Sequence, residues 1–288
     1  MTASPILVAS PTTRSGTTLL QRLITSSENG ICYGEFCGRR IVELCEFAHR
    51  ELLLVQHNKE RQAHEWTNVL GGNVDYWMVG LDLPDDFASH ALAGAVKFYK
   101  QHYDEGSRTV GKEIWAAKVP KLSFQQIVKV SDLINDLKCI YIFRNVFDVI
   151  KSQKSKGWIT SKPKLVAACE EWFANTEVVA TLKRNNFENL PAMMHVIEYE
   201  QLVADPAGHI AGIEAFTGLR GIRSEVANTK VNAWISKPGD TGAPESAYLT
   251  PGHLSRGECE IIDEICSTRM RELYPSLSAE DFISDDDA

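Results

Sequence analysis

A short turn, residues 14–18 (Arg-Ser-Gly-Thr-Thr), carries the most chemistry in this chain and follows the apolar stretch 6–9. The pattern predicts a strand, a tight turn and the start of a helix. A helix N-terminus favours negative charge, and here a glycine, hydroxyls, free amides and an arginine gather beside it. We therefore expect the turn to bind a phosphate. The alternative is a Ser/Thr-rich helix cap without a ligand. The candidate binding residues are Thr13, Arg14, Ser15, Gly16, Thr17 and Thr18.

The turn differs from the loop that binds nucleoside triphosphates. That loop, Gly-x-x-x-x-Gly-Lys-Ser/Thr, carries a lysine directly after its second glycine. Here Thr17 follows Gly16, and the nearest cation, Arg14, precedes the glycine. The sequence therefore disfavours a triphosphate as the ligand.

A second candidate for phosphate binding lies in residues 139–152, an apolar run that ends in Arg-Asn and then becomes helical. An arginine at the end of a strand and a serine two helical turns later can contact one phosphate from two sides. Arg144 and Ser152 have this spacing. The alternative pairs Arg144 with Asp148 and leaves Ser152 on a solvated helix face.

Two more ionisable residues stand where elements begin or end. Lys118 follows the apolar residues 114–117, and Pro120 then stops the strand. Because strand ends in open α/β sheets point into the ligand crevice, we expect Lys118 on the same rim as the turn and Arg144. A lysine at a strand end can equally extend into solvent. Glu35, which follows Gly34, is the second of these residues and a candidate for the pocket. The alternative for Glu35 is a helix cap or a surface charge.

Together these segments resemble the sulfotransferases that use 3'-phosphoadenosine 5'-phosphosulfate (PAPS). Residues 14–18 are similar to the 5'-phosphosulfate loop of that family, in which Lys or Arg precedes Ser-Gly-Thr-Thr. Residues 144–152 are similar to its 3'-phosphate motif, Arg-Asn-Pro-x-Asp-x-x-x-Ser. Two positions depart from the family pattern, because Thr13 and Val146 stand where the family has prolines.

The resemblance implies catalytic roles. Lys118 matches the catalytic lysine of the family, and Arg14 is expected to help it neutralise charge on the leaving oxygen. Glu35 matches the Gly-Glu of Golgi-type and many bacterial members, in which the glutamate is the base. Cytosolic members use a histidine in the lysine segment instead, and residues 118–120 contain none.

Two further nucleotide contacts follow from the resemblance. Tyr199, in residues 195–206, matches a tyrosine that lies near the adenine, although a core tyrosine is an equal alternative. Lys230 is the candidate from a late loop that covers the nucleotide, with Lys237 in reserve.

The implied reaction is transfer of the sulfuryl group from PAPS to a hydroxyl or amine of a small-molecule acceptor, a bacterial metabolite, without a metal. Two other functions stay open. A P-loop small-molecule kinase would need a lysine after Gly16 and a magnesium-binding aspartate. A non-catalytic nucleotide-binding module would leave Glu35 and Lys118 dispensable.

The elements that must position these residues alternate along the chain. Strands are expected at 5–9, 114–118, 138–143 and 194–198. Helices are expected at 17–27, 37–62, 88–104, 123–135, 146–155 and 163–185. This order predicts an α/β, P-loop-like three-layer fold with a central parallel sheet flanked by helices. We expect one domain over residues 1–288, with a helical insertion on the acceptor side near 37–112.

Composition limits the classes of function. With 288 residues, 44% of them hydrophobic, the chain can bury a full core, and its net charge of −8 argues against a nucleic-acid partner. No stretch approaches the roughly 20 apolar residues of a membrane span, so we expect neither membrane insertion nor an export signal. Seven cysteines without a Cys-x-x-Cys pattern fit reduced thiols in a cytoplasm. The oligomeric state is left open, a homodimer included.

Overall fold

The computed structural model describes residues 4–83, 85–228 and 254–283. Its centre is a five-stranded sheet in the order β2-β3-β1-β4-β5, and every pairing in it is parallel. The strands are β1 (Ile6–Ser10), β2 (Gly30–Tyr33), β3 (Ile114–Pro120), β4 (Lys138–Phe143) and β5 (Met194–Glu198). Parallel strands with both faces covered are apolar along their whole length, and β1 and β4 show this pattern.

The strand order brings three carboxyl ends to one edge of the sheet. β1 lies between β3 and β4, with Val8 opposite both Lys118 and Ile140. Since the three strands run in the same direction, the segments that follow them emerge side by side. These segments are the turn after Ser10, the end of β3 and the Arg-Asn pair after Phe143.

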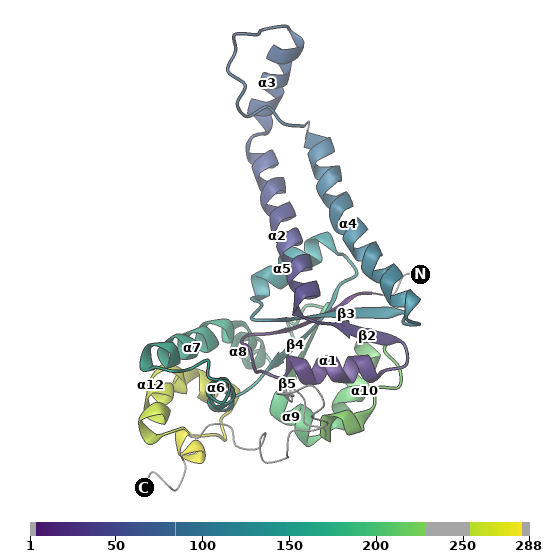
Figure 1. The fold of residues 1–288 in the computed structure, drawn as a ribbon. Helices are drawn as coiled ribbons and strands as arrows, with labels where there is room; N and C mark the ends of the chain where they lie inside the picture. The colour runs from purple at the N-terminus through teal and green to yellow at the C-terminus, as the bar shows by residue number, and fades with distance from the viewer. Residues whose placement is uncertain (1–3, 84, 229–253, 284–288) are drawn as a thin grey trace.

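Helices cover both faces of the sheet, which gives three layers (Figure 1). One face packs on α1 (Thr17–Ser26), α9 (Tyr199–Ala204) and α10 (Pro206–Thr217). The other face packs on α5 (Phe124–Leu133), α6 (Val146–Lys154), α7 (Lys162–Asn175), α8 (Glu177–Arg184) and α12 (Arg256–Leu273). Alternate residues of β1 enter the two cores, Leu7 the second and Val8 the first. The predicted P-loop-like three-layer α/β fold is therefore confirmed.

Two long helices leave the second face and form an arm, residues 35–109 (Figure 1). The arm consists of α2 (Glu35–His57), α3 (Lys59–Leu70) and α4 (Asp85–Thr109). The first turns of α2 pack on β3 and α5, while α3 lies at the end farthest from the sheet. Gly38 allows this close approach, because a Cβ there would stand 2.1 Å from Val119 Cγ2.

Most predicted strands and helices are found within a few residues of their expected bounds, with three corrections. The single helix expected over 37–62 was wrong, because α2 ends at His57 and α3 runs from Lys59 to Leu70. The sequence reasoning missed β2, a four-residue edge strand that is too short to show a period. The single helix expected over 163–185 was wrong, because α7 ends at Asn175 and α8 begins at Glu177. Between them the hydroxyl of Thr176 donates to the carbonyl of Trp172. No helix within the described ranges is long and apolar enough to cross a membrane.

The contact between α2 and β3 can be tested with two glycines. We expect Gly38→Ala to lower the free energy of unfolding by about 1 to 3 kcal/mol, because the new methyl group overpacks against Val119 and the carbonyl of Lys118. Gly94→Ala in α4 is the matched control: nothing lies within 4 Å of its added Cβ, so it should stabilise by about 0.5 to 1 kcal/mol. Urea unfolding followed by circular dichroism measures both changes. Equal effects of the two substitutions would contradict the close approach.

Candidate active site

A pocket opens at the edge where β1, β3 and β4 end. It encloses about 800 Å³ of space, part of it open to solvent. Residues from every predicted motif in the described chain line it. They are Thr13, Arg14, Gly16, Thr17, Thr18, Glu35, Lys118, Arg144, Ser152 and Tyr199. The two predicted anion-binding segments therefore face one another across a single pocket.

The turn after β1 presents the N-terminus of α1 to the pocket. Gly16 is the N-cap of α1 with a φ of 110°, and Arg14 also has a positive φ of 71°. A Cβ at Gly16 would lie 2.5 Å from Tyr199 Cδ2, so glycine is required both for the backbone conformation and for the space. The first amides of a helix have no partners within it, and Thr17 and Thr18 occupy this first turn. No acidic residue opposes an anion there.

Ser15 has a different place from the other turn residues. Its side chain is fully buried, and its hydroxyl donates to the carbonyl of Thr12 at 3.0 Å. The hydroxyls of Thr12 and Ser15 are also 3.0 Å apart. The lining of the pocket does not include Ser15. Its hydroxyl therefore shapes the turn from inside.

Arg14 joins the two anion-binding segments directly. Its Nε donates to Ser152 Oγ at 2.8 Å, although 138 residues separate them in the sequence. Its guanidinium also stands 6.0 Å from the centre of the Trp158 ring. The positive field extends to Lys156, whose pKa is lowered by burial and by the nearby Arg14. The neighbourhood is thus poised to attract an anion.

Arg144 combines both roles that the sequence left open. Its Nη2 lies 3.1 Å from Asp148 Oδ2, so the ion pair is present, yet Arg144 also lines the pocket. Its guanidinium lies over the ring of Tyr199, 4.4 Å from the ring centre. Its buried Nε has no hydrogen-bond partner among the described residues, and such a donor is costly unless a ligand pairs with it. These contacts orient the guanidinium and leave donor capacity for a ligand.

The backbone around Arg144 is held by a second set of polar contacts. Asn145 caps α6 by accepting from the amide of Asp148 at 2.9 Å. Glu200 accepts from the amide of Asn145 at 3.1 Å and from its Nδ2 at 2.6 Å. The hydroxyl of Tyr274 donates to the other oxygen of Glu200 at 3.1 Å. Val146 is the first residue of α6, a position that suits proline but does not require it.

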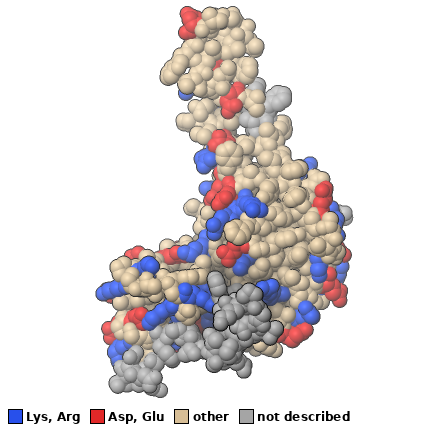
Figure 2. Space-filling view, viewed as in Figure 1, with Lys and Arg blue, Asp and Glu red and all other residues tan. Residues whose placement is uncertain are grey.

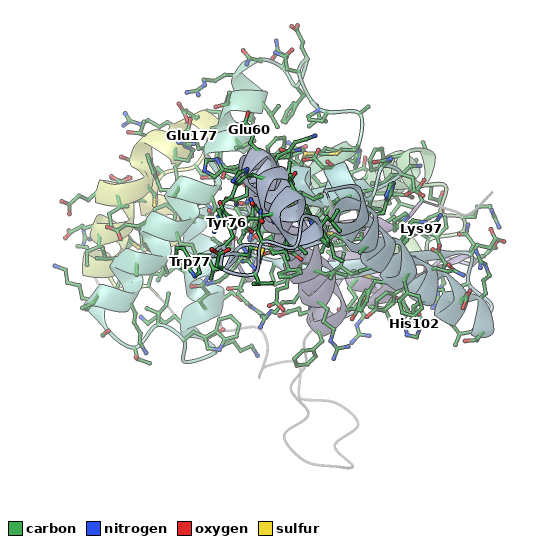
Figure 3. The ribbon with its side chains drawn as sticks, turned by 90° about the horizontal axis from the view of Figure 1, so that it is seen from above. Glu60, Tyr76, Trp77, Lys97, His102 and Glu177 are labelled. Carbon is green, nitrogen blue, oxygen red and sulfur yellow. The ribbon has the colours of Figure 1, made fainter. Side chains whose placement is uncertain are left out.

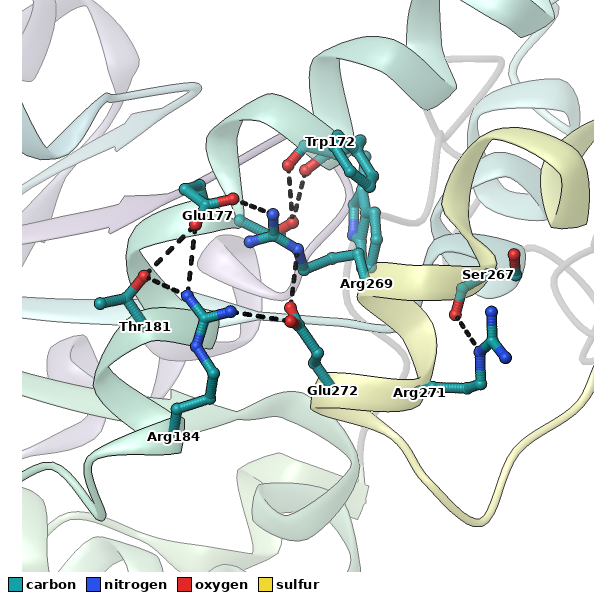
Figure 4. A network of polar contacts seen from close by, with 10 residues as sticks. Trp172, Glu177, Thr181, Arg184, Ser267, Arg269, Arg271 and Glu272 are labelled. Carbon is teal, nitrogen blue, oxygen red and sulfur yellow. Dashed lines mark hydrogen bonds and ion pairs between the residues drawn. The ribbon is translucent and has the colours of Figure 1, made fainter.

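A buried arginine of α12, Arg269, ties α8 to α12 by ion pairs (Figure 4) and lies over the ring of Phe173 of α7, 4.9 Å from the ring centre. Arg269 pairs with Glu177 and, at 3.3 Å, with Glu272, and Arg184 reaches Glu272 at 2.9 Å. On the same helix α7, Trp172 Nε1 donates to the carbonyl of Arg144 at 2.9 Å. Arg269 therefore helps to hold α7, the helix whose Trp172 binds the backbone of Arg144.

Lys118 and Glu35 form an ion pair at the opposite wall of the pocket. Lys118 Nζ lies 3.1 Å from Glu35 Oε1 and donates to Thr18 Oγ1 at 3.3 Å. The side chain of Lys118 is 11% exposed and that of Glu35 is 47% exposed. The buried ammonium can thus serve a bound anion at α1, while the carboxylate faces solvent or a second ligand. Glu35 is the first residue of α2, so a short edge strand and a helix start deliver it.

The cysteines beside Glu35 take no part in this pocket. All seven cysteines are buried, and neither Cys32 nor Cys37 lines the pocket. Burial raises the pKa of Cys37 to about 11 and raises that of Cys32 further. Both thiols are therefore protonated at neutral pH and pack as small apolar groups.

Some lining residues were missed, and one candidate cannot be placed. Trp158, half exposed after α6, lines the pocket together with Leu19 and Pro120. A lone aromatic residue in a lysine-rich stretch offered no motif by which to find it. Lys230 and the reserve Lys237 lie outside the described residues. None of the described residues between 57 and 112 appears in the lining, so their role on the acceptor side stays a prediction. In the described chain no three metal-ligating side chains gather at one point.

Comparison with known proteins places these features in context. The model of the sulfotransferase family matches residues 5–222. A sulfotransferase domain from the curacin biosynthetic pathway is 19% identical, with 86% of this chain and 83% of that chain covered and a TM-score of 0.44. A sulfotransferase domain from the Synechococcus PCC 7002 olefin synthase is 18% identical, with 91% and 94% covered and a TM-score of 0.46. No curated protein matches the chain significantly.

The support of Arg144 by Glu200 can be tested through stability. We expect Glu200→Ala to lower the free energy of unfolding by about 1 to 3 kcal/mol, because the donors of Asn145 and Tyr274 lose a charged acceptor. Tyr274→Phe deletes one donor only and should cost about 0.5 to 1.5 kcal/mol. Denaturant unfolding of both variants measures the difference. A larger loss for Tyr274→Phe than for Glu200→Ala would rule out Glu200 as the centre of this group.

Proposed function

Since the chain belongs to the sulfotransferase family, we propose that it transfers the sulfuryl group of PAPS to a hydroxyl or amine of a small-molecule acceptor. The observation that carries this proposal is the shared pocket. The turn at α1 and the Arg144–Ser152 segment line it together, with the Lys118–Glu35 ion pair in its wall. Its seven cysteines are all buried and form no Cys-x-x-Cys pattern, which fits a reducing compartment, and we place the reaction in the cytoplasm.

The donors in the pocket suit a ligand with two separate anionic groups. We assign the 5'-phosphosulfate to the α1 N-terminus, where Thr17, Thr18 and Lys118 supply donors. We assign the 3'-phosphate to Arg144 and Ser152, because the unpaired Nε of Arg144 calls for an acceptor. Tyr199 lies beside both, and its ring offers a flat surface for the adenine.

Catalysis in this arrangement depends on alignment and on charge neutralisation. In the proposed step the bond between sulfur and the bridging 5'-phosphate oxygen breaks as the oxygen or nitrogen of the acceptor bonds to sulfur, with the attacking atom and the leaving oxygen in line. Lys118 and Arg14 stabilise the negative charge that grows on the leaving oxygen. Glu35 accepts the proton of the acceptor hydroxyl or amine. The products are the sulfated acceptor and adenosine 3',5'-bisphosphate.

The ion pair fixes the position of Lys118 relative to that of Glu35. Lys118 contacts both Thr18 of the phosphate-binding helix and the carboxylate of Glu35. The base is therefore held beside the group that serves the leaving oxygen, on the more exposed side of the pocket. Positioning of this kind can lower a barrier substantially because the entropy of alignment is lost during folding rather than during the reaction.

Binding distinguishes this proposal from the P-loop kinase. We expect adenosine 3',5'-bisphosphate to raise the melting temperature, with about 2.7 kcal/mol of added stability at a hundred times its Kd. ATP with magnesium should give a much smaller shift, because Thr17 stands where a triphosphate loop needs lysine. Arg144→Ala should remove most of the bisphosphate effect. Thermal shift assays measure all three, and stabilisation by ATP alone would favour the kinase.

Turnover distinguishes the enzyme from a non-catalytic nucleotide-binding module. We expect Lys118→Ala to reduce turnover by about 10² to 10³, the cost of removing one stabilising donor from a developing anion. Bisphosphate binding should fall far less than turnover, because Thr17, Thr18 and the amides of α1 still serve the 5'-phosphate and Arg144 still serves the 3'-phosphate. Lys121→Ala is the matched control, since Lys121 is exposed and pairs with Glu171 away from the pocket lining. Screening acceptors with radiolabelled PAPS supplies the assay, and unchanged turnover in Lys118→Ala would exclude the assigned role.

A further inference from the structure

The far end of the arm exposes an unusual number of large apolar side chains. We call residues 70–83 the tip. It lies at the point of the arm most distant from the sheet (Figure 1). Its exposed apolar residues, with exposed fractions from 54% to 92%, are Leu70, Val74, Trp77, Val79 and Leu83. Single exposed apolar residues are ordinary, but a cluster of this kind marks an interaction site.

The tip has a defined shape because α3 holds it. Gln62 Nε2 donates to the carbonyl of Gly80 at 3.0 Å, and Trp66 Nε1 donates to that of Asp82 at 2.9 Å. Tyr76 packs edge-on against His64 with ring centres 5.4 Å apart. Seen along the arm, Tyr76 and Trp77 lie together on one side of its helices (Figure 3). A surface ordered in advance loses little entropy on binding.

The charge of the tip is entirely acidic. Asp75 and Asp82 are the charged residues between positions 70 and 83, and no lysine or arginine occurs there. The space-filling view shows the end of the arm as mostly uncharged surface with acidic patches (Figure 2). The partner that fits best is therefore apolar with a basic rim.

The same arm carries a surface with these properties. A groove open to solvent lies along α2 and beside α5, and we call it the arm groove. Leu53 and Leu54 supply its apolar part, with 53% and 48% of each residue exposed. Arg50 and Lys129 supply its basic charge beside His49 and His57, against the single acidic lining residue Glu46. Arg50 is 65% exposed at its side chain, although it lies 3.3 Å from Glu51. The arm groove thus complements the tip in both polarity and charge.

We propose that the arm is a dimerisation element in which the tip of each copy lies in the arm groove of the other. A two-fold axis perpendicular to the arm, which passes beside it midway between tip and groove, places the two arms side by side and antiparallel. Because the interface is then the same on both copies, one such axis satisfies both tip–groove contacts at once. Acidic groups of each tip meet basic groups of the facing groove, which favours this register over a parallel one.

A bilayer is the main rival occupant of the tip. Trp and Tyr suit a membrane interface, but residues 70–83 offer two aspartates and no cation to anionic lipids. Arg61 of α3, which lies against Gly80, is paired with Glu65 at 2.9 Å. A bilayer also leaves the arm groove without a role. The second copy accounts for both surfaces, and its test needs no sulfotransferase activity.

Sedimentation velocity over a concentration series tests the dimer. We expect the wild-type chain to show a monomer–dimer equilibrium, and Val79→Asp to raise the dimer Kd by at least about tenfold, because a carboxylate must be buried at each of two contacts. Val203→Asp is the matched control, since Val203 is 44% exposed on α9, outside the arm. Circular dichroism and bisphosphate binding check that both variants fold. A monomer at every concentration, or equal effects of the two variants, would overturn the proposal.

A charge exchange tests the reciprocal arrangement itself. Asp75→Lys alone and Arg50→Glu alone should each weaken the dimer, because like charges then face one another at both contacts. An equimolar mixture of the two variants should recover it, since one contact becomes Lys against Glu and the other keeps the wild-type pair. No recovery on mixing would exclude the tip–groove pairing. Monomers that float with zwitterionic vesicles, and lose this binding in Val79→Asp, would assign the tip to a bilayer instead.

Discussion

The parallel pairing of β1 with β3 on one side and β4 on the other is the constraint on which the pocket depends. Each strand is followed by a segment that supplies part of the pocket lining, and the pairing sets the carboxyl ends of the strands next to one another. Arg14, Lys118 and Arg144 come together across about half of the chain in this way. A shift of one residue in either register would turn the side chains of the strand from one core to the other. Packing of the two hydrophobic cores therefore fixes the register, and with it the positions of the pocket residues.

Gathering cations at one edge has an electrostatic cost, and the structure offsets it locally. Two unit charges 4 Å apart interact by about 4 kcal/mol at an effective dielectric constant of 20, so unpaired neighbours would repel strongly. Arg144 is balanced by Asp148 and the face of Tyr199, and Lys118 is balanced by Glu35. These partners leave the pocket positive enough to attract an anion. They also hold each cation in one position, which ties the stability of the site to its proposed function.

Sequence reasoning found the site because its residues follow apolar strands at spacings with a direct physical meaning. Arg144, at the end of β4, and Ser152, two turns into α6, required only the strand end and the helix start to be recognised. It did not find β2, whose four residues pair with β3 through contacts distant in sequence. Nor did it separate Ser15 from its neighbours, because burial of one hydroxyl in a Ser/Thr-rich turn depends on the turn's three-dimensional shape.

The sequence by itself determined the alternation of strands and helices, the turn before α1 and the residues able to do chemistry, because these are local properties of pattern and spacing. Only the tertiary structure decided that Arg14 contacts Ser152, that Lys118 pairs with Glu35, and that Glu200 supports the backbone at Arg144. Each of these contacts joins segments that are distant in the chain. Strand order and register alone bring them together, and neither is encoded by local spacing.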